Sequence, residues 1–196
     1  MSKFLLMSTN KFKVRVYQHI CQQLGHELEV AKGLPEVEEP YDSLYLNALG
    51  KLESGIKNYD GEYDYAIVDD SGLFIPSMGG YPGVHTKRET ERFERINGAG
   101  TGINSTINFI IKQAGGEKAK LQSSIIIYDR KTGRKCSMPA QTYGVLPTEA
   151  FQYEKGSTKP WTEYLLRNRK GGYSSLAFRD ARMNAVGDIL QQLSAV

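Results

Sequence analysis

The sequence predicts an α/β fold with a mixed β-sheet, and three features lead to that prediction. Short apolar runs of strand length alternate with segments of helical periodicity through the first half of the chain. Two later strand-like segments are joined by Asp-Arg-Lys-Thr-Gly, which has the composition of a hairpin turn. The length of 196 residues suits one sizeable core better than two, so we expect residues 1–196 to form a single domain.

In the first half of the chain, strands and helices are predicted in turn. Residues 3–7 form a short apolar run typical of a buried strand, and residues 8–10 are a turn and helix-capping signal. The next helix is predicted over residues 11–24, with apolar residues at helical spacing from Val14 onward. The remaining predictions here are strands at 28–31 and 64–68, a helix at 44–56, and an acidic loop bracketed by prolines at 34–40.

The second half adds a hairpin and three helices. Residues 123–128 are apolar and β-branched, as expected of a buried strand, and a strand over 135–145 returns antiparallel after the turn at 129–133. The helices are predicted at residues 90–99, 103–114 and 178–193.

Composition narrows the classes of protein that this chain can belong to. The net charge of +3 is small and forms no long basic tail, which argues against a binder of duplex nucleic acid and suits a small anionic substrate. The two cysteines, Cys21 and Cys136, lie far apart in the sequence and form no CxxC motif, so we expect reduced thiols. A thiolate metal site would need more ligands. No window approaches the roughly 18 apolar residues that span a membrane, and no signal peptide is recognisable, so we expect a cytoplasmic protein.

The first segment that can bind an anion is Ser8-Thr9-Asn10, which lies between a predicted strand and a helix containing Lys13. Free N–H groups at a helix N-terminus attract negative charge, and Lys13 adds a full positive charge one turn later. A plain N-cap has the same composition, because Ser, Thr and Asn are common capping residues. The segment is therefore either a phosphate site or an ordinary helix start.

Two adjacent carboxylates, Asp69 and Asp70, follow the strand predicted at residues 64–68. Ligands of α/β sheets bind at the carboxyl ends of strands, and the two side chains point to opposite sides if the strand continues. A carboxylate there can hold Mg²⁺ or deprotonate water, and Glu36, Glu38 and Glu39 in the acidic loop offer a second one. An Asp-Ser-Gly turn and a solvated acidic loop are the plain alternatives.

Five segments occur in an order that resembles the inosine triphosphate pyrophosphatase family: STNKFK, LPEVEE, NALGK, DDSGLFIPSMGGYPGVHTKR and KPWTEY. The fourth, from Asp69 to Arg88, is the longest and most specific, and the resemblance covers the chain from Phe4 to about Tyr164. It implies a twisted mixed sheet with flanking helices and two lobes around a central cleft. It also implies hydrolysis of a deaminated purine nucleoside triphosphate to the monophosphate and pyrophosphate, with Mg²⁺, usually by a homodimer.

The resemblance assigns the phosphate-binding residues by their place in the matched segments. Ser8, Asn10, Lys13 and Lys51 would hold the triphosphate. These residue types suit the reaction, because the charge of the leaving pyrophosphate must be neutralised by cations.

The metal and the attacking water are assigned in the same way. Glu36 and Asp70 would lie at the metal, and Asp70 or Asp69 would activate the water. Ser71 would add a contact to the phosphates, and Arg88 would face the same substrate.

The base-reading part departs from the family pattern. Phe151, Tyr153 and Glu154 stand for the family's Phe, aromatic residue and Asp, without the flanking glycines, and Phe151 can stack on a base or pack in the core. The family's Ser-His-Arg has no histidine here, and either Arg182 or Arg179 supplies the arginine. A deaminated purine is thus the first expectation, and a pyrimidine or modified deoxynucleotide the second. A nucleotide-binding protein without catalysis is the third.

Overall fold

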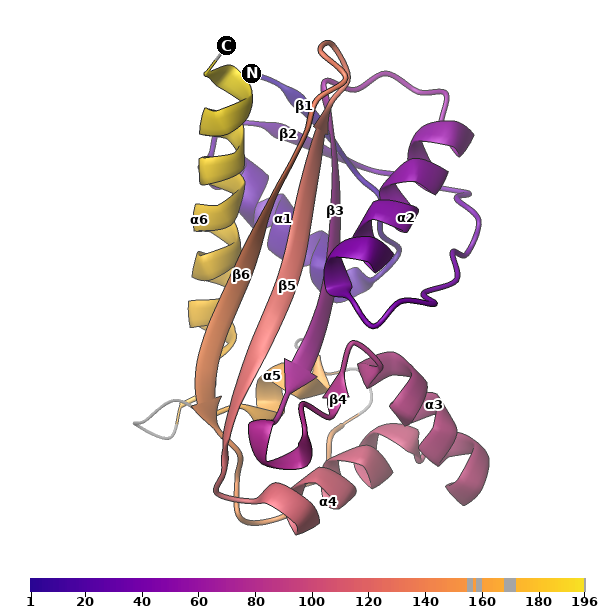
Figure 1. The fold of residues 1–196 in the computed structure, drawn as a ribbon, viewed down its shortest axis with the longest axis vertical. Helices are drawn as coiled ribbons and strands as arrows, with labels where there is room; N and C mark the ends of the chain where they lie inside the picture. Colours follow the sequence, from indigo (N-terminus) through magenta and orange to yellow (C-terminus); the bar gives the residue numbers. More distant parts are fainter. Residues whose placement is uncertain (155–156, 158–159, 168–171, 196) are drawn as a thin grey trace. The chain divides into compact units, whose positions relative to one another are not determined.

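The computed structural model describes residues 1–154, 157, 160–167 and 172–195 (Figure 1). The strands are β1 (Lys3–Leu6), β2 (Glu27–Val30), β3 (Tyr65–Phe74), β4 (Pro82–Gly83), β5 (Lys118–Asp129) and β6 (Lys135–Val145). The helices are α1 (Lys11–Gln23), α2 (Leu44–Asn58), α3 (Thr86–Asn97), α4 (Gly102–Ala114), α5 (Trp161–Leu165) and α6 (Ser175–Ser194), with a short 3-10 turn η1 (Pro76–Met78). Among the described residues, no helix has the combined length and apolar character that crossing a bilayer requires.

The strands form one mixed sheet in the order β2-β1-β3-β5-β6, with β4 beside β3. β1 is parallel to both β2 and β3, whereas β4 is antiparallel to β3. The turn between β5 and β6 is so short that these neighbouring strands must be antiparallel. The predicted mixed sheet with flanking helices is confirmed.

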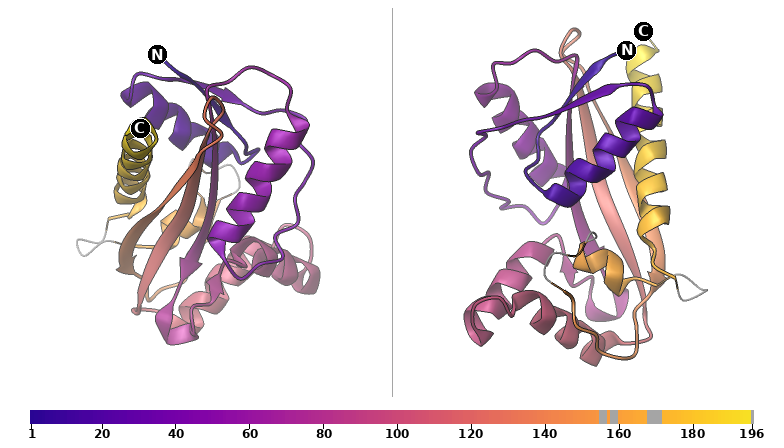
Figure 2. Two further views of the ribbon diagram at one scale, coloured as in Figure 1. Left: turned by 45° about the horizontal axis from the view of Figure 1, so that its top comes forward. Right: turned by 180° about the vertical axis from the view of Figure 1, so that it is seen from behind.

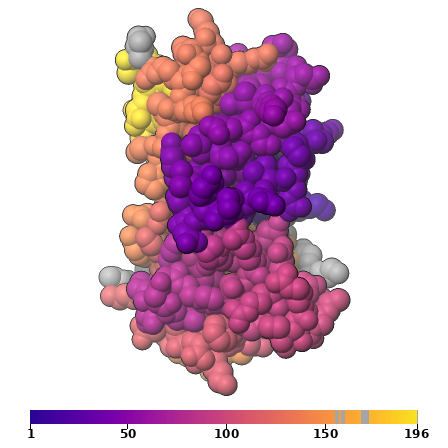
Figure 3. All heavy atoms as spheres, turned by 45° about the vertical axis from the view of Figure 1, so that its right-hand side comes forward, coloured from indigo at the N-terminus to yellow at the C-terminus, as the bar shows by residue number. Residues whose placement is uncertain are grey.

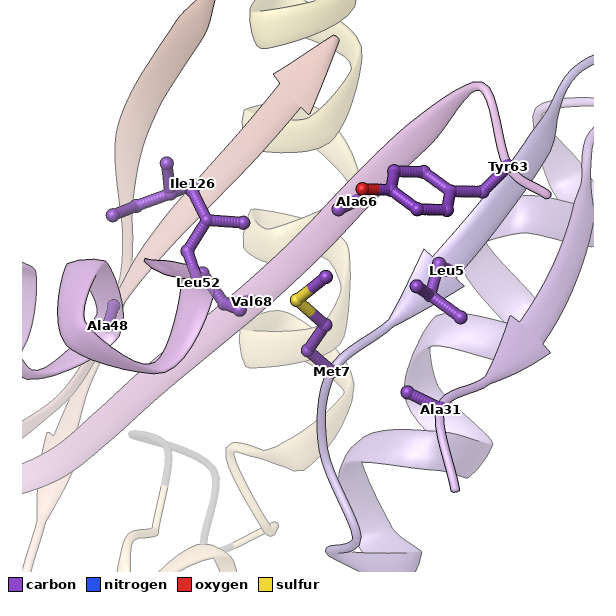
Figure 4. Packing of buried hydrophobic residues seen from close by; sticks show 9 residues of the cluster. All are labelled: Leu5, Met7, Ala31, Ala48, Leu52, Tyr63, Ala66, Val68 and Ile126. Atoms are coloured by element: carbon purple, nitrogen blue, oxygen red, sulfur yellow. The ribbon is translucent and has the colours of Figure 1, made fainter. Parts of the chain in front are cut away.

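Different helices cover the two faces of the sheet around β1 and β3. α2 lies against one face, and α1 and α6 lie on the other (Figure 2). Figure 4 shows the α2 side, where Leu5 and Met7 at β1 and Val68 of β3 pack with Leu52 of α2. Successive residues of a strand point to opposite faces, so the buried Ile67 points toward α1 and α6.

Two compact units can be distinguished in the chain, and three strands contribute to both. Unit 1 comprises Met1–Asp70, Ser123–Ala140 and Arg179–Val196, and unit 2 comprises Ser71–Gln122 and Gln141–Phe178. Figure 3 shows the surface that α2 and the loop preceding it give to unit 1. Every residue of the charged cluster described below belongs to unit 1.

In unit 2, β4 packs very closely on the second half of β3. A Cβ built on Gly72 would lie 2.2 Å from the carbonyl oxygen of Gly83, so this approach requires glycine. The Thr86 hydroxyl donates to the same carbonyl at 2.7 Å and accepts from the N–H of Leu73 at 3.3 Å. The glycine of the Asp-Asp-Ser-Gly segment is therefore explained by a backbone contact.

The structure corrects several expected boundaries. β3 continues to Phe74, so Asp69 and Asp70 lie inside the strand and not in a turn after it. β5 begins at Lys118 and α3 at Thr86, both earlier than predicted, and the short α5 was not predicted at all. Backbone pairing lengthens strands beyond their apolar runs, and buried ion pairs let Asp occupy a strand that its β-propensity disfavours.

Candidate functional site

Asp69 and Asp70 are both buried in β3, and the pleat of the strand directs them to opposite faces of the sheet. Asp69 points toward α1 and α6, whose side chains it contacts. Asp70 points toward α2 and contacts Lys51 there. The two neighbouring carboxylates therefore occupy different chemical environments.

Asp69 is the centre of a buried ionic cluster. Its Oδ2 atom lies 3.0 Å from Nε of Arg182 in α6 and accepts a hydrogen bond from the Tyr17 hydroxyl of α1 at 2.9 Å. Its Oδ1 atom lies 3.3 Å from Nζ of Lys13, which also donates to the Asp69 backbone carbonyl at 2.5 Å. Arg182 Nε donates further to the Ser123 hydroxyl of β5 at 3.3 Å. The Asp69 carboxylate thus joins β3 to α1 and α6, and Arg182 extends the cluster to β5.

The surroundings of Asp69 and Lys13 change their pKa values. Burial by itself raises the pKa of Asp69, but Lys13, Arg182 and the Tyr17 hydrogen bond outweigh it and lower the pKa to about 2. Burial lowers the pKa of Lys13, although Asp69 and Asp70 oppose the effect. Asp69 therefore stays ionised at neutral pH and is a poor proton acceptor.

On the α2 face, Lys51 lies between two carboxylates. Its ammonium is 2.7 Å from Oδ1 of Asp70 and 2.5 Å from Oε1 of Glu39, which belongs to the loop before α2. Burial lowers the pKa of Lys51, but Asp70 and Glu39 together produce a net rise, so the ammonium stays charged. Asp70 and Glu39 are held as close neighbours because they share this cation.

Two carboxylates at one position suit a hard divalent ion. Mg²⁺ is usually held by one or two protein carboxylates together with water and substrate phosphates. The part of the chain that the structure describes contains no group of three or more His, Cys, Asp or Glu side chains arranged to hold a metal, so a fully protein-made cage is absent there. Asp70 and Glu39 fit the Mg²⁺ pattern, whereas Glu36 is exposed in the same loop and its assignment stays a prediction.

The start of α1 is a capped helix, as the sequence predicts. The Asn10 side-chain oxygen accepts from the N–H groups of Phe12 at 2.9 Å and Lys13 at 3.4 Å. The Ser8 hydroxyl accepts from the N–H of Asn10 at 3.3 Å. These bonds fix the first turn of α1, from which the Lys13 side chain reaches Asp69. Phosphate contacts by Ser8 and Asn10 stay predictions.

The other predicted contacts belong to unit 2 or to the surface of α6. Ser71 and Arg88 lie in unit 2, where a guanidinium nitrogen of Arg88 is 3.3 Å from Nδ1 of His85. Arg179 is partly exposed and pairs with Asp180 at 3.3 Å. Arg182, predicted as a base-reading residue, is instead buried against Asp69.

The predicted base-reading segment is held by α4 and α5 of unit 2. The Asn104 side chain accepts from the Tyr153 N–H at 2.7 Å and donates to its carbonyl at 3.4 Å. The Tyr153 ring makes an edge contact with Tyr164, 5.6 Å between centroids. Phe151 is half-buried and Glu154 is exposed. Of the matched KPWTEY segment, Lys159 lies outside the described residues.

Sequence reasoning gave no site role to two residues of the cluster, Tyr17 and Ser123. Tyr17 follows Lys13 by one helical turn, so helix periodicity places the two on one face. Glu39 is one of the three loop residues, with Glu36 and Glu38, that the sequence offers as a second carboxylate, and the structure pairs it with Lys51. The sequence around Ser123 contains no motif that points to a site, because strand pairing in the sheet is what brings Ser123 to the cluster.

Most of the chain matches a known family model. Residues 4–157 match the model of the Ham1 family. A dITP/XTP pyrophosphatase of Polaromonas naphthalenivorans is 31% identical over 133 residues, which cover 63% of this chain and 62% of that protein. A dITP/XTP pyrophosphatase of Methylococcus capsulatus is 40% identical over 88 residues, covering 44% and 42%. The chain thus spans less than two thirds of the length of these relatives.

Solved structures with the same fold include two Ham1 proteins. The protein from Coxiella burnetii aligns with a TM-score of 0.72 over 98% of this chain and 100% of its own, at 16% identity. The protein from Staphylococcus aureus aligns with a TM-score of 0.65 over 98% of each chain, also at 16% identity. At this level of identity the likeness establishes the fold, in agreement with the mixed sheet described above.

Proposed function

This chain belongs to the Ham1 family, and we propose that it hydrolyses a nucleoside triphosphate to the monophosphate and pyrophosphate. Deaminated purine nucleotides, such as ITP, dITP and XTP, are the proposed substrates, supported by the dITP/XTP pyrophosphatases that the chain resembles. The observation that carries the proposal is the cluster in unit 1, where two lysines and two adjacent carboxylates meet at β3. Such a set can bind a polyanion and accept a proton from water.

We infer that Mg²⁺ is the cofactor and that Asp70 and Glu39 would hold it, with Glu36 as a further candidate from the same loop. When bound, Mg²⁺ would neutralise phosphate charge and polarise the phosphorus–oxygen bonds. The structural support is the pair of carboxylates that Lys51 holds together.

The residues of the cluster would have different roles in the reaction. The ammonium groups of Lys13 and Lys51 would bind phosphate oxygens and stabilise the negative charge of the departing pyrophosphate. Asp70 would take a proton from the water that attacks the α-phosphorus, because both oxygens of Asp69 face Arg182, Tyr17 and Lys13, whereas Asp70 contacts Lys51 through Oδ1. Asp69 instead positions Lys13, whose ammonium it contacts through both its backbone and its side chain.

A different base preference is the second candidate. Arg182 was expected to read the base, yet it is 4% exposed and bound to Asp69. A base site without this guanidinium and without the family's histidine would rank nucleotides differently, because each missing donor changes which partner atoms are satisfied. A pyrimidine or modified deoxynucleotide is therefore the alternative substrate.

A panel of nucleoside triphosphates tests both candidates. The purified chain is incubated with each nucleotide with Mg²⁺ or with EDTA, and monophosphate, diphosphate and pyrophosphate are separated. We expect pyrophosphate and monophosphate as the only products, formed fastest from ITP, dITP or XTP, and no turnover in EDTA.

The variant Asp70→Asn tests the proposed general base. It should lower kcat by about 10²-fold or more, as loss of a general base does, whereas Asp188→Asn, an exposed change on α6, should leave kcat unchanged. Orthophosphate as the sole phosphate product would contradict the proposal, and no turnover with any nucleotide would favour a binding protein.

Assembly and location complete the proposal. We propose a homodimer, by analogy with the family that the sequence resembles, and a location in the cytoplasm, as the composition of the sequence predicts. Sedimentation velocity over a range of protein concentrations would measure the mass directly, and a monomer at every concentration would contradict the dimer.

A further inference from the structure

Arg182 is a buried cation that pairs with Asp69, and Asp69 also pairs with Lys13. We propose that Arg182 is a positioning residue that neutralises Asp69 and so leaves the Lys13 ammonium available to a phosphate group. The proposal rests on the proposed function, because it takes Lys13 as a phosphate ligand. It replaces the expectation that Arg182 reads the base.

The two oxygens of Asp69 are used unequally. Oδ2 lies 3.0 Å from Arg182 Nε and accepts from the Tyr17 hydroxyl at 2.9 Å. Oδ1 is buried and has no hydrogen bond within the described residues, and its contact with Lys13 is an ion pair at 3.3 Å. The shorter contacts of the Asp69 carboxylate are therefore those with Arg182 and Tyr17, and the contact with Lys13 is the longest of the three.

The shortest contact of the Lys13 ammonium is with a neutral group. Its ammonium donates to the backbone carbonyl of Asp69 at 2.5 Å, and its side chain remains 13% exposed. An ammonium has three N–H donors, so one bond to a carbonyl leaves donors that can turn to an incoming anion.

Burial explains why a second cation is needed at Asp69. The Asp69 side chain is fully buried, and a buried carboxylate that loses its partner is strongly destabilising. If Lys13 were the sole counter-ion, binding a phosphate to Lys13 would weaken the neutralisation of Asp69 and oppose substrate binding. Arg182 keeps Asp69 neutralised whether or not Lys13 also binds a phosphate. Less free energy is therefore lost at Asp69 when the Lys13 ammonium turns to a phosphate.

Binding of inorganic pyrophosphate tests the inference separately from turnover. Titration calorimetry in Mg²⁺ would compare the wild type with Arg182→Met and Arg182→Lys. We expect the Kd of pyrophosphate to rise at least tenfold in Arg182→Met and to recover partly in Arg182→Lys, which keeps the charge. For the best nucleotide, KM should rise by a similar factor while kcat changes less, as expected when binding common to ground and transition states is lost.

Arg134→Met is the matched control. The Arg134 guanidinium also holds α6, through the carbonyls of Gln192 and Leu193 at 3.2 and 3.1 Å, but it does not contact Asp69. This variant removes the same kind of group from a residue that contacts the same helix, and it should leave the Kd of pyrophosphate unchanged. An equal rise in both variants would mean that docking of α6, and not the charge on Asp69, matters.

A double variant keeps the test decisive if Arg182→Met folds poorly. Arg182→Met combined with Asp69→Asn removes both charges, so Lys13 is no longer drawn to a carboxylate and pyrophosphate affinity should return toward the wild-type value. Circular dichroism checks that each variant is folded at the temperature used. An unchanged Kd in Arg182→Met, or no recovery in the double variant, would overturn the inference. A wild type that binds pyrophosphate in this Arg182-dependent way but turns over no nucleotide would instead overturn the proposed function alone.

Discussion

Asp69 and Asp70 are chemically identical neighbours that the fold makes different. Asp69 is held between Arg182, Lys13 and Tyr17, whereas Asp70 shares Lys51 with Glu39. The sequence places both residues at the site but leaves their roles open, because alternation along the strand assigns opposite faces without saying what each face contains. The distinction depends on Arg182, which lies far away in sequence and which no local spacing connects to Asp69.

Asp69 should make stability depend on pH in the acid range. Its folded-state pKa of about 2 lies below the unfolded value of 3.8, so its ionised form stabilises the fold above pH 4 and this contribution is lost as pH falls through about 2. The difference in unfolding free energy between the wild type and Asp69→Asn should therefore shrink by about 2 kcal/mol between pH 5 and pH 2. Urea unfolding of both proteins at a series of pH values measures this difference in unfolding free energy, which should be constant from pH 5 to pH 7. A difference that is the same at pH 2 and pH 5 would contradict the assignment.

At the scale of elements, the parts that could be predicted from the sequence are those with local signals. Apolar periodicity and caps gave β1, α1, α2, α4 and β6 close to their observed bounds. The course of β3 through Asp69 and Asp70 could not be predicted, because the polar residues resemble a turn and only partners on other elements make a strand favourable there. The same holds for the pairing of β4 with β3, which depends on the space that Gly72 leaves.

The contact between α2 and Met7, the residue that follows β1, gives a prediction at this scale. A Cβ on Gly55 would lie 2.1 Å from Sδ of Met7, with Cε and Cγ at 3.0 and 3.1 Å, so the whole Met7 side chain would have to move. Gly55→Ala should therefore destabilise the protein by about 1–3 kcal/mol, as overpacking of cores does. Gly50→Ala is the control on the same helix, because its Cβ would meet only Val37 Cγ1 at 4.0 Å, and better helix propensity should stabilise it by up to about 1 kcal/mol. Urea unfolding of both variants measures the change in the free energy of unfolding. Equal stabilisation by the two substitutions would show that α2 does not lie on Met7 as described.

At the scale of the whole molecule, the site of one unit is built on strands that both units share. β3 passes from unit 1 to unit 2 directly after Asp70, β5 does so directly before Ser123, and β6 crosses at Ala140. Melting either unit would disrupt strands of the other. The chain should therefore unfold as the single domain that its length suggests, in one cooperative transition with equal calorimetric and van't Hoff enthalpies.

Ligand binding to unit 1 should then raise the melting temperature of the entire chain. A ligand that binds the folded state at 100 times its Kd stabilises it by about 2.7 kcal/mol. For a domain of this size each kcal/mol shifts Tm by about 2–4 °C, so pyrophosphate with Mg²⁺ should raise the single transition by roughly 5–10 °C. In Arg182→Met the same pyrophosphate concentration should give a smaller shift, because the weaker site is less occupied, whereas Arg134→Met should respond like the wild type. Scanning calorimetry would reveal the opposite case directly: two transitions, of which pyrophosphate moves only one, would mean that the shared strands do not couple the units.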